Sequence, residues 1–266
     1  MEVNCSDHKV SEADLSLCRA TVYSALALGF RPPTAETLSR IIEPQNTAAL
    51  TDAAGLLDAD GKMDLVAAIE ISASTGRAGV ASVAASYRAL FGHTARGGVP
   101  PYETEYGNEA LFQQPQELGD LMGFYRAFGL AVKLDEHERA DHISCECEFL
   151  SFLAMKEAYA LEHDNREMLA ETRKAEKLFL RDHLARFLPT FAANLTREDS
   201  SGFYGALALL SIRFIGAECA RLGVVAGAPN LGLRPADDSR VPVACGNGPE
   251  CAMMPGANSP EGAGSL

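Results

Sequence analysis

The chain has 266 residues, of which 47% are hydrophobic and 22% charged, so it can bury a sizeable core without a disulfide or metal. Its 36 acidic and 23 basic residues give a net charge of −13, which argues against nucleic acid as a partner, because a phosphate backbone requires a basic surface. Trp is absent and aromatic residues make up only 7%, a balance that favours helices over strands.

Two helices are predicted at the start of the chain. The first begins at Ser11, which with Asp14 three residues later resembles a capping box, Asp replacing the usual Glu or Gln. Pro32-Pro33 closes this helix. The second is capped by Thr34 and stops near Pro44. The residues before the first helix are polar and lack the apolar segment of a secretory signal, so we expect a cytoplasmic protein with reduced cysteines.

Weaker helical segments follow, and the last of them ends at Gly92. It carries Tyr87, Leu90 and Phe91 on one stripe, a pattern that is usually core when it stands alone. A loop rich in Gly and Pro then covers residues 92–101.

Three longer helices are predicted after this loop. One begins at Pro115, one is capped by Asp141, and one covers residues 165–191 with Pro189 bending or ending it. A final helix covers residues 203–223. No run alternates as a strand does, so the predicted fold is all-α, a single helical bundle.

The composition changes at about Val224 to Gly, Pro, Ala and Asn. We therefore predict a helical domain over residues 1–223 and an irregular or disordered tail over 224–266. Cys245 and Cys251 lie in this tail, where free thiols are the default interpretation.

No nucleotide-binding, zinc-protease or nucleophile-elbow motif is present. His142 and Glu146 share a helix face and could hold a metal, but neighbouring Cys145 and Cys147 point in different directions. The better physical interpretation is a helix start with carboxylates at the positive end of its dipole. We predict no metal, no cofactor and no catalytic residue.

Three segments, in this order, resemble the TorD/DmsD family of redox-enzyme maturation chaperones. The aromatic-x-x-Leu-aromatic motif is matched by Tyr87, Leu90 and Phe91. The Pro-Tyr-Glu-Ser/Thr motif is matched by Pro101, Tyr102, Glu103 and Thr104. The Glu-x-Pro-Asp-His-Ile/Leu motif and its following helix are matched by Glu138, Asp141, His142, Ile143, Glu146, Glu148 and Phe149. Ala140 stands where the family usually has Pro.

The resemblance implies a chaperone for the immature catalytic subunit of a molybdopterin oxidoreductase of the dimethyl sulfoxide reductase type. Such a protein binds the twin-arginine signal peptide, aids cofactor insertion and prevents premature export. The residues implied in peptide binding are Tyr87, Leu90, Phe91, Pro101, Tyr102, Glu103, Glu105, Glu138, Asp141 and His142. The carboxylates would meet the arginines through charge-assisted hydrogen bonds, and the apolar side chains would take the apolar part of the peptide.

The charge distribution agrees with a basic partner. Residues 102–164 hold 14 acidic and 4 basic side chains, which are either ordinary solvated helix faces or a surface that attracts a basic peptide. Two rival functions stay open: a helical adaptor with an unrelated client, and an enzyme using Asp141 and His142 as an acid/base pair. A membrane span is not predicted, and the sequence leaves monomer and domain-swapped dimer open.

Overall fold

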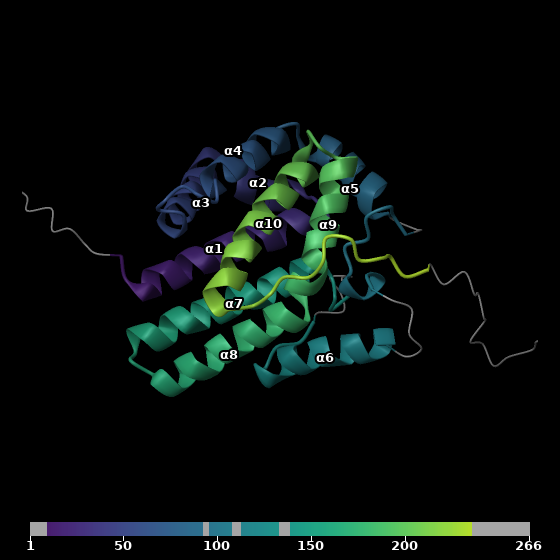
Figure 1. Cartoon of the computed structure of the whole chain (residues 1–266). Coiled ribbons are helices and arrows are strands. Elements are labelled where there is room, and N and C mark those ends of the chain that lie inside the picture. The colour runs from purple at the N-terminus through teal and green to yellow at the C-terminus, as the bar shows by residue number, and fades with distance from the viewer. Residues whose placement is uncertain (1–9, 93–95, 108–112, 133–138, 236–266) are drawn as a thin grey trace, which may run out of the picture. The chain divides into compact units, whose positions relative to one another are not determined.

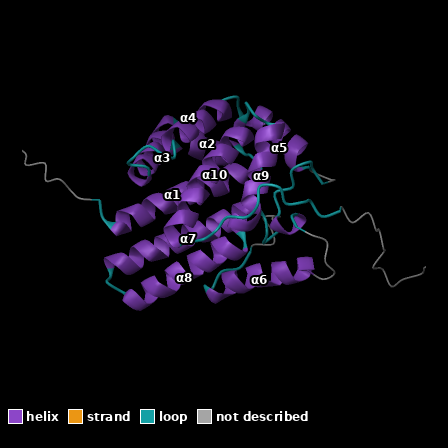
Figure 2. Ribbon diagram, in the orientation of Figure 1, coloured by secondary structure: helices purple, strands orange, loops and turns teal. Residues whose placement is uncertain are grey.

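The computed structural model describes residues 10–92, 96–107, 113–132 and 139–235. Within these ranges the chain forms ten α-helices and one 3-10 turn, and its only β pairing consists of isolated bridges, which confirms the predicted all-α class (Figure 2). The elements are α1 (Glu12–Phe30), α2 (Ala35–Ile42), α3 (Pro44–Leu57), α4 (Leu65–Gly76), α5 (Val80–Phe91), η1 (Glu103–Glu105), α6 (Gln113–Ala127), α7 (Ile143–Glu162), α8 (Arg166–Asp182), α9 (Leu184–Glu198) and α10 (Phe203–Leu222).

Helix α1 lies at the centre of the bundle, between α7 on one side and α2 and α3 on the other (Figure 1). Helix α7 also packs on α8, while α10 packs on α9 and α4. Large side chains fill the space between these helices, and those that are almost completely buried include Phe30, Phe179, Phe187, Phe191 and Phe214. Their burial is the main stabilising contribution to the fold.

The predicted starts and ends of several helices are confirmed. Ser11 and Asp14 form a reciprocal capping box at the start of α1, and Thr34 caps α2. Pro44 occupies the first position of α3, where its missing N–H leaves no helical hydrogen bond unmade. Gly92 and Gly223 end α5 and α10 with positive φ angles that suit glycine.

Two predicted boundaries are wrong. The N-cap of α7 is His142, whose side chain accepts a hydrogen bond from the Ser144 N–H, and not Asp141. The single helix predicted over 165–191 is broken at His183, while Pro189 lies inside α9 without ending it. Both differences involve contacts between residues distant in sequence, because the Asp141 carboxylate bonds Thr104 and the His183 ring lies against Glu103.

Pro189 also explains why the segment after α10 lies on α9. Because proline has no N–H, the carbonyl of Ala185, four residues earlier, lacks its helical donor. The Gly227 N–H donates to this carbonyl at 2.8 Å. Only glycine allows this approach, since a Cβ on Gly227 would lie 2.0 Å from the Arg186 oxygen.

The compact unit therefore extends to Arg234, beyond the helical boundary predicted at 223. Residues 224–234 form no helix and are largely exposed, but backbone hydrogen bonds such as that of Gly227 hold them against the bundle, and Arg234 is buried. The rest of the predicted tail, with Cys245 and Cys251, lies outside the described residues.

Helix α10 is long and apolar enough to cross a membrane by length and composition alone. However, 67% of its apolar window is buried inside the bundle, as in the core helix of a globular domain. Its buried Glu218 is bonded to Arg221, which also bonds Glu176 of α8 at 2.9 Å. Burial, with Glu157 nearby, raises the pKa of Glu176 to about 7.

Candidate functional site

The second and third motif segments, about forty residues apart, form one paired structure beside the start of α7. The Glu103 N–H donates to the Asp141 carbonyl, and the Ile143 N–H donates to the Pro101 carbonyl, both at 2.9 Å. The backbone thus holds together those predicted binding residues of both motifs that the structure describes. All four of these residues are buried.

The Asp141 carboxylate is satisfied inside the protein. Its Oδ2 accepts hydrogen bonds from the Thr104 hydroxyl at 2.7 Å and from Arg139 Nη2 at 2.8 Å, and the Thr104 N–H adds a longer one. The side chain has no exposed surface. Asp141 therefore joins the two motif segments instead of presenting a charge to a partner.

Tyr102 and His142 lie opposite each other in an isolated antiparallel bridge, with their rings 5.2 Å apart. The Arg139 guanidinium lies 4.6 Å from the centre of the Tyr102 ring. Burial, with smaller contributions from Arg31 and Arg139, lowers the pKa of His142 to about 3. His142 is consequently neutral at physiological pH and acts as a helix cap.

Glu103 is the centre of a buried ion pair between η1 and the α8–α9 junction. One of its oxygens accepts two hydrogen bonds from Arg186, at 2.8 and 3.2 Å, and the other lies 3.1 Å from Nδ1 of His183. This contact explains the helix break at His183, because the ring turns inward to Glu103. Glu103 is 0% exposed, so it too is used internally.

Glu105, the remaining described carboxylate of the predicted set, is half-buried. It lies 3.2 Å from Arg96 and 3.6 Å from Arg139. Glu138 lies outside the described residues. The predicted arginine-binding carboxylates that the structure describes are thus already paired with arginines of the same chain.

Glu146 is a buried carboxyl in the first turn of α7, and neither of its oxygens has a hydrogen-bond partner in the described part of the chain. Burial raises its pKa well above the usual range, and the nearby charges of Glu103 and Asp141 raise it further. The protonated form is therefore favoured. No group of three or more His, Cys, Asp or Glu side chains arranged for a metal occurs among the described residues.

Replacing Glu146 by glutamine is expected to stabilise the protein increasingly as the pH rises. The raised pKa means that the folded state holds the Glu146 proton more tightly than the unfolded state does. The parent therefore loses stability from about pH 4–5 upward, through the raised pKa. Glutamine keeps the shape of the neutral acid and removes this loss. Urea unfolding at pH 5 and pH 8 gives the free energy of unfolding of the variant and of the parent. A difference between the two proteins that does not grow with pH contradicts the expectation.

The predicted stripe of the first motif is mostly core. Leu90 and Phe91 are 8% and 6% exposed. The Phe91 ring lies 4.8 Å from that of Tyr87, 5.0 Å from that of Tyr204 and 6.1 Å from that of Phe191. Only Tyr87 is half-buried, so it alone keeps accessible surface.

A family model described as nitrate reductase delta subunit matches residues 49–193, more than half of the chain and the region that carries all three motifs. The chain belongs to this family, the chaperone family of TorD and DmsD.

The relatives are named as chaperones and not as enzymes. The chaperone protein TorD of Photobacterium profundum is 29% identical over 53% of this chain and 63% of its own length. TorD of Vibrio cholerae is 32% identical over 50% of this chain and 59% of its own length. The perchlorate reductase assembly chaperone of Dechloromonas aromatica is 28% identical over 78% of this chain and 91% of its own length. The chain thus matches about three fifths of the two TorD proteins.

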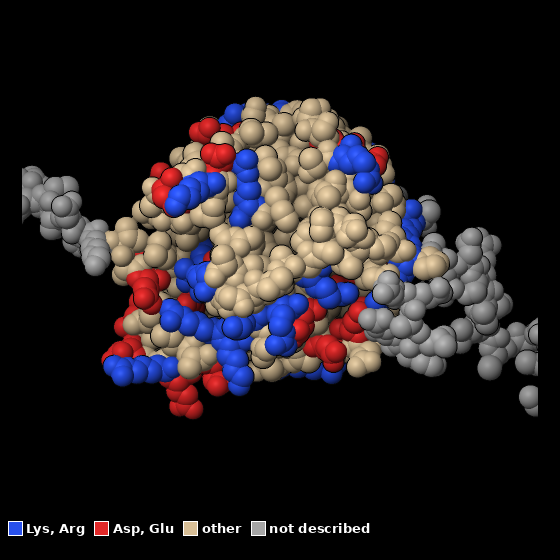
Figure 3. Space-filling view, viewed as in Figure 1, with Lys and Arg blue, Asp and Glu red and all other residues tan. Residues whose placement is uncertain are grey.

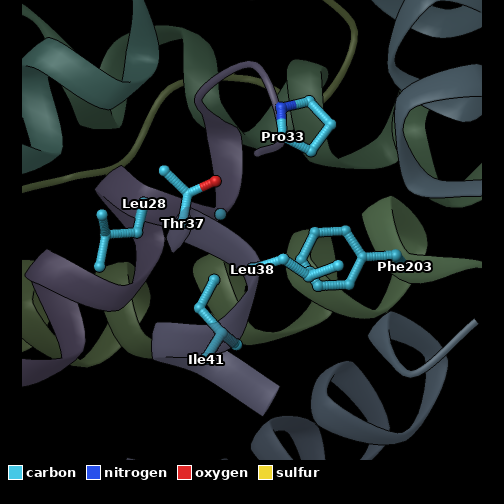
Figure 4. A pocket seen from close by; sticks show the side chains of 7 residues that line it. Leu28, Pro33, Thr37, Leu38, Ile41 and Phe203 are labelled. Carbon is cyan, nitrogen blue, oxygen red and sulfur yellow. The ribbon is translucent and has the colours of Figure 1, made fainter. Parts of the chain in front are cut away.

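Two of the hollows in the described part of this family member bear on ligand binding. The smaller, between the end of α1, α2 and the start of α10, is lined by Leu28, Thr37, Leu38, Ile41 and Phe203 among others, which leave no room for a ligand (Figure 4). The larger has a volume of about 600 Å³ and lies between α6 and the α8–α9 junction. Its lining includes Glu117, Asp120, Phe124, Asp182, His183 and Arg186.

The residues of this larger cavity are absent from the sequence-based set. They come from two regions that are more than fifty residues apart, and no local motif marks them. Charged side chains of both signs are interleaved over α6, α7 and α8 in Figure 3, whereas few lie over α5 and α9. The excess of acidic residues in 102–164 is partly internal, since Glu103, Asp141, Glu146 and Glu157 are all 0% exposed.

Proposed function

We propose that this chain is a cytoplasmic chaperone for the immature catalytic subunit of a molybdopterin oxidoreductase of the dimethyl sulfoxide reductase type. It binds that subunit together with its twin-arginine signal peptide, aids cofactor insertion and holds back export until the cofactor is in place. Relatives of the chain are named as assembly chaperones of perchlorate, selenate and chlorate reductases, which supports a reductase client.

The observation that carries the proposal is the pairing of the Pro101–Thr104 and Asp141–Ile143 segments beside a cavity that suits a basic peptide. Arg186 links the two features, because it bonds Glu103 and also lines the cavity. A twin-arginine peptide has two basic residues followed by an apolar stretch. The cavity offers carboxylates and the half-buried ring of Phe124 in its lining.

The arrangement gives little support to an enzyme. Asp141 and His142 are both 0% exposed, and the Asp141 carboxylate is bonded to Thr104 and Arg139, so neither can reach a substrate. The low pKa of His142 also removes it from acid/base chemistry near neutrality. A helical adaptor with an unrelated client remains the rival, and peptide binding separates the two.

A synthetic twin-arginine signal peptide is expected to bind the full chain with a dissociation constant near 1 μM, about −8 kcal/mol. Affinity should fall as salt rises, because the charges at the cavity are partly exposed. A peptide with Lys-Lys in place of Arg-Arg should bind more weakly, since lysine lacks the planar fork that matches a carboxylate. Isothermal titration measures all three.

Asp120→Asn should weaken this binding about two- to fivefold, as loss of one partly exposed charge contact does. Asp120 is exposed on α6, lines the cavity and makes no ion pair with another described residue. The matched control is Asp52→Asn, which removes an exposed carboxylate from α3. Failure of the peptide to bind the parent protein would favour the adaptor, and equal weakening by both variants would remove the cavity from the binding site.

A further inference from the structure

The segment 224–234 crosses α9 after the end of α10 and is largely exposed (yellow in Figure 1). Val225 is 90% exposed and Leu233 is 39% exposed. Arg234 is the exception, because its side chain is only 5% exposed. This segment, here called the strap, therefore has one buried anchor, and that anchor is an arginine.

Arg234 is held in the way that a carboxylate site holds an arginine from a ligand. Its two terminal nitrogens lie 3.0 Å from the two oxygens of Glu117, a bidentate pair. One of them also donates to the Thr104 carbonyl at 2.8 Å. These two residues, together with the Glu105 carbonyl, are here called the arginine slot.

The strap backbone pairs with the second motif segment as an added strand would. The Arg234 N–H donates to the Glu105 carbonyl, and the Gly107 N–H donates to the Gly232 carbonyl, both at 2.9 Å. Between them Tyr106 and Leu233 form an isolated antiparallel bridge. Peptide recognition by an exposed backbone edge uses these same contacts.

The slot continues into the larger cavity. Glu117 holds Arg234 and also lines the cavity. Arg186 lines the same cavity, and its Nη2 lies 3.6 Å from a Glu117 oxygen. Beyond Glu117, the cavity is lined by Asp120 and Phe124. One carboxylate is thus in the slot and a second lies along the cavity.

We propose that the arginine slot is a receptor for an arginine in an extended peptide, and that Arg234 occupies it in the free protein as a tethered substitute. The client peptide displaces the strap, and the strap closes the site again when the client leaves. The choice of a twin-arginine signal peptide as client rests on the proposed function. The slot itself rests on the contacts of Arg234.

The tether has a measurable consequence. If the strap is seated in about nine molecules out of ten, the apparent affinity for a competing peptide is reduced tenfold. Arg234→Ala should remove most of this competition. The first probe is a labelled peptide with the sequence of residues 229–236, titrated by fluorescence anisotropy into the full-length variant and the parent.

This strap peptide is expected to bind Arg234→Ala up to about tenfold more tightly than it binds the parent. The same peptide with alanine at its arginine should lose binding, and so should the double variant Arg234→Ala, Glu117→Gln. Leu233→Ala is the matched control within the strap and should bind as the parent does, because that side chain is exposed. Equal binding to the parent and to Arg234→Ala, with thermal unfolding unchanged, overturns the slot.

The second probe is the twin-arginine signal peptide, added alone and in competition with the strap peptide. Tighter binding to Arg234→Ala and mutual displacement support the proposal. Binding that is unaffected by Arg234→Ala and by the strap peptide overturns it, while the proposed chaperone function stands. Binding of the strap peptide alone supports an arginine slot and counts against the twin-arginine client.

Discussion

Arg186→Ala is expected to lower the free energy of unfolding by about 3–5 kcal/mol at neutral pH, as removal of one partner from a buried ion pair does. Arg186 supplies two of the hydrogen bonds to Glu103, whose carboxylate is 0% exposed. Without Arg186 that carboxylate keeps, among the described residues, only His183 as a side-chain partner. Chemical unfolding of the variant and the parent gives the difference directly.

Arg181→Ala is the matched control, since Arg181 lies in the last turn of α8 and pairs at the surface with Asp182. Exposed pairs contribute little, so this change should leave stability nearly unaltered. Adding Glu103→Gln to Arg186→Ala should restore part of the loss, because the buried charge is then gone. An effect of Arg186→Ala no larger than that of Arg181→Ala would mean that Glu103 is not buried as a charge.

This pair shows why the predicted set of binding residues was only partly informative. The second and third motifs assign Glu103, Asp141 and His142 to one binding site, and the structure does bring these residues together. However, the partners of Glu103 lie 80 and 83 residues away in sequence. An acidic residue in a loop has the same sequence signal whether it faces solvent or a buried arginine. The pattern therefore cannot tell a residue that binds a partner from one that stabilises the fold.

Helix boundaries were predictable where the capping residue acts locally. Ser11, Thr34, Gly92 and Gly223 each act through their own backbone or a neighbour within three residues, and each lies where the sequence pattern places it. The break at His183 depends on a distant carboxylate. Proline was misleading at position 189, because a donor from Gly227 supplies the hydrogen bond that the proline lacks.

The strap escaped prediction for a related reason. Its composition of Gly, Pro and Asn is typical of an irregular tail, and only its contacts with residues distant in sequence, such as those of Gly227 and Arg234, show that it is anchored. The residues of the larger cavity are likewise contributed by distant helices. The cavity and the slot, and not the buried carboxylates of the motifs, are thus the surfaces at which a peptide can be tested.

The first motif leads to the same distinction between support and contact. Phe91→Ala is expected to cost about 3–5 kcal/mol of unfolding free energy, as truncation of a buried aromatic side chain does. The Phe91 ring packs against three other rings, from Tyr87, Phe191 and Tyr204, and alanine leaves a cavity among them. Thermal or urea unfolding measures the loss.

The control is Tyr159→Ala, which removes an exposed aromatic ring from α7 and should change stability little. Peptide titration at a temperature where Phe91→Ala is still folded then shows whether Phe91 is a core residue or contacts the peptide. If Phe91 only supports the bundle, the folded variant binds a twin-arginine peptide as tightly as the parent. A variant that is as stable as the parent but loses the peptide would return Phe91 to the binding surface, where the sequence pattern had placed it together with Tyr87 and Leu90.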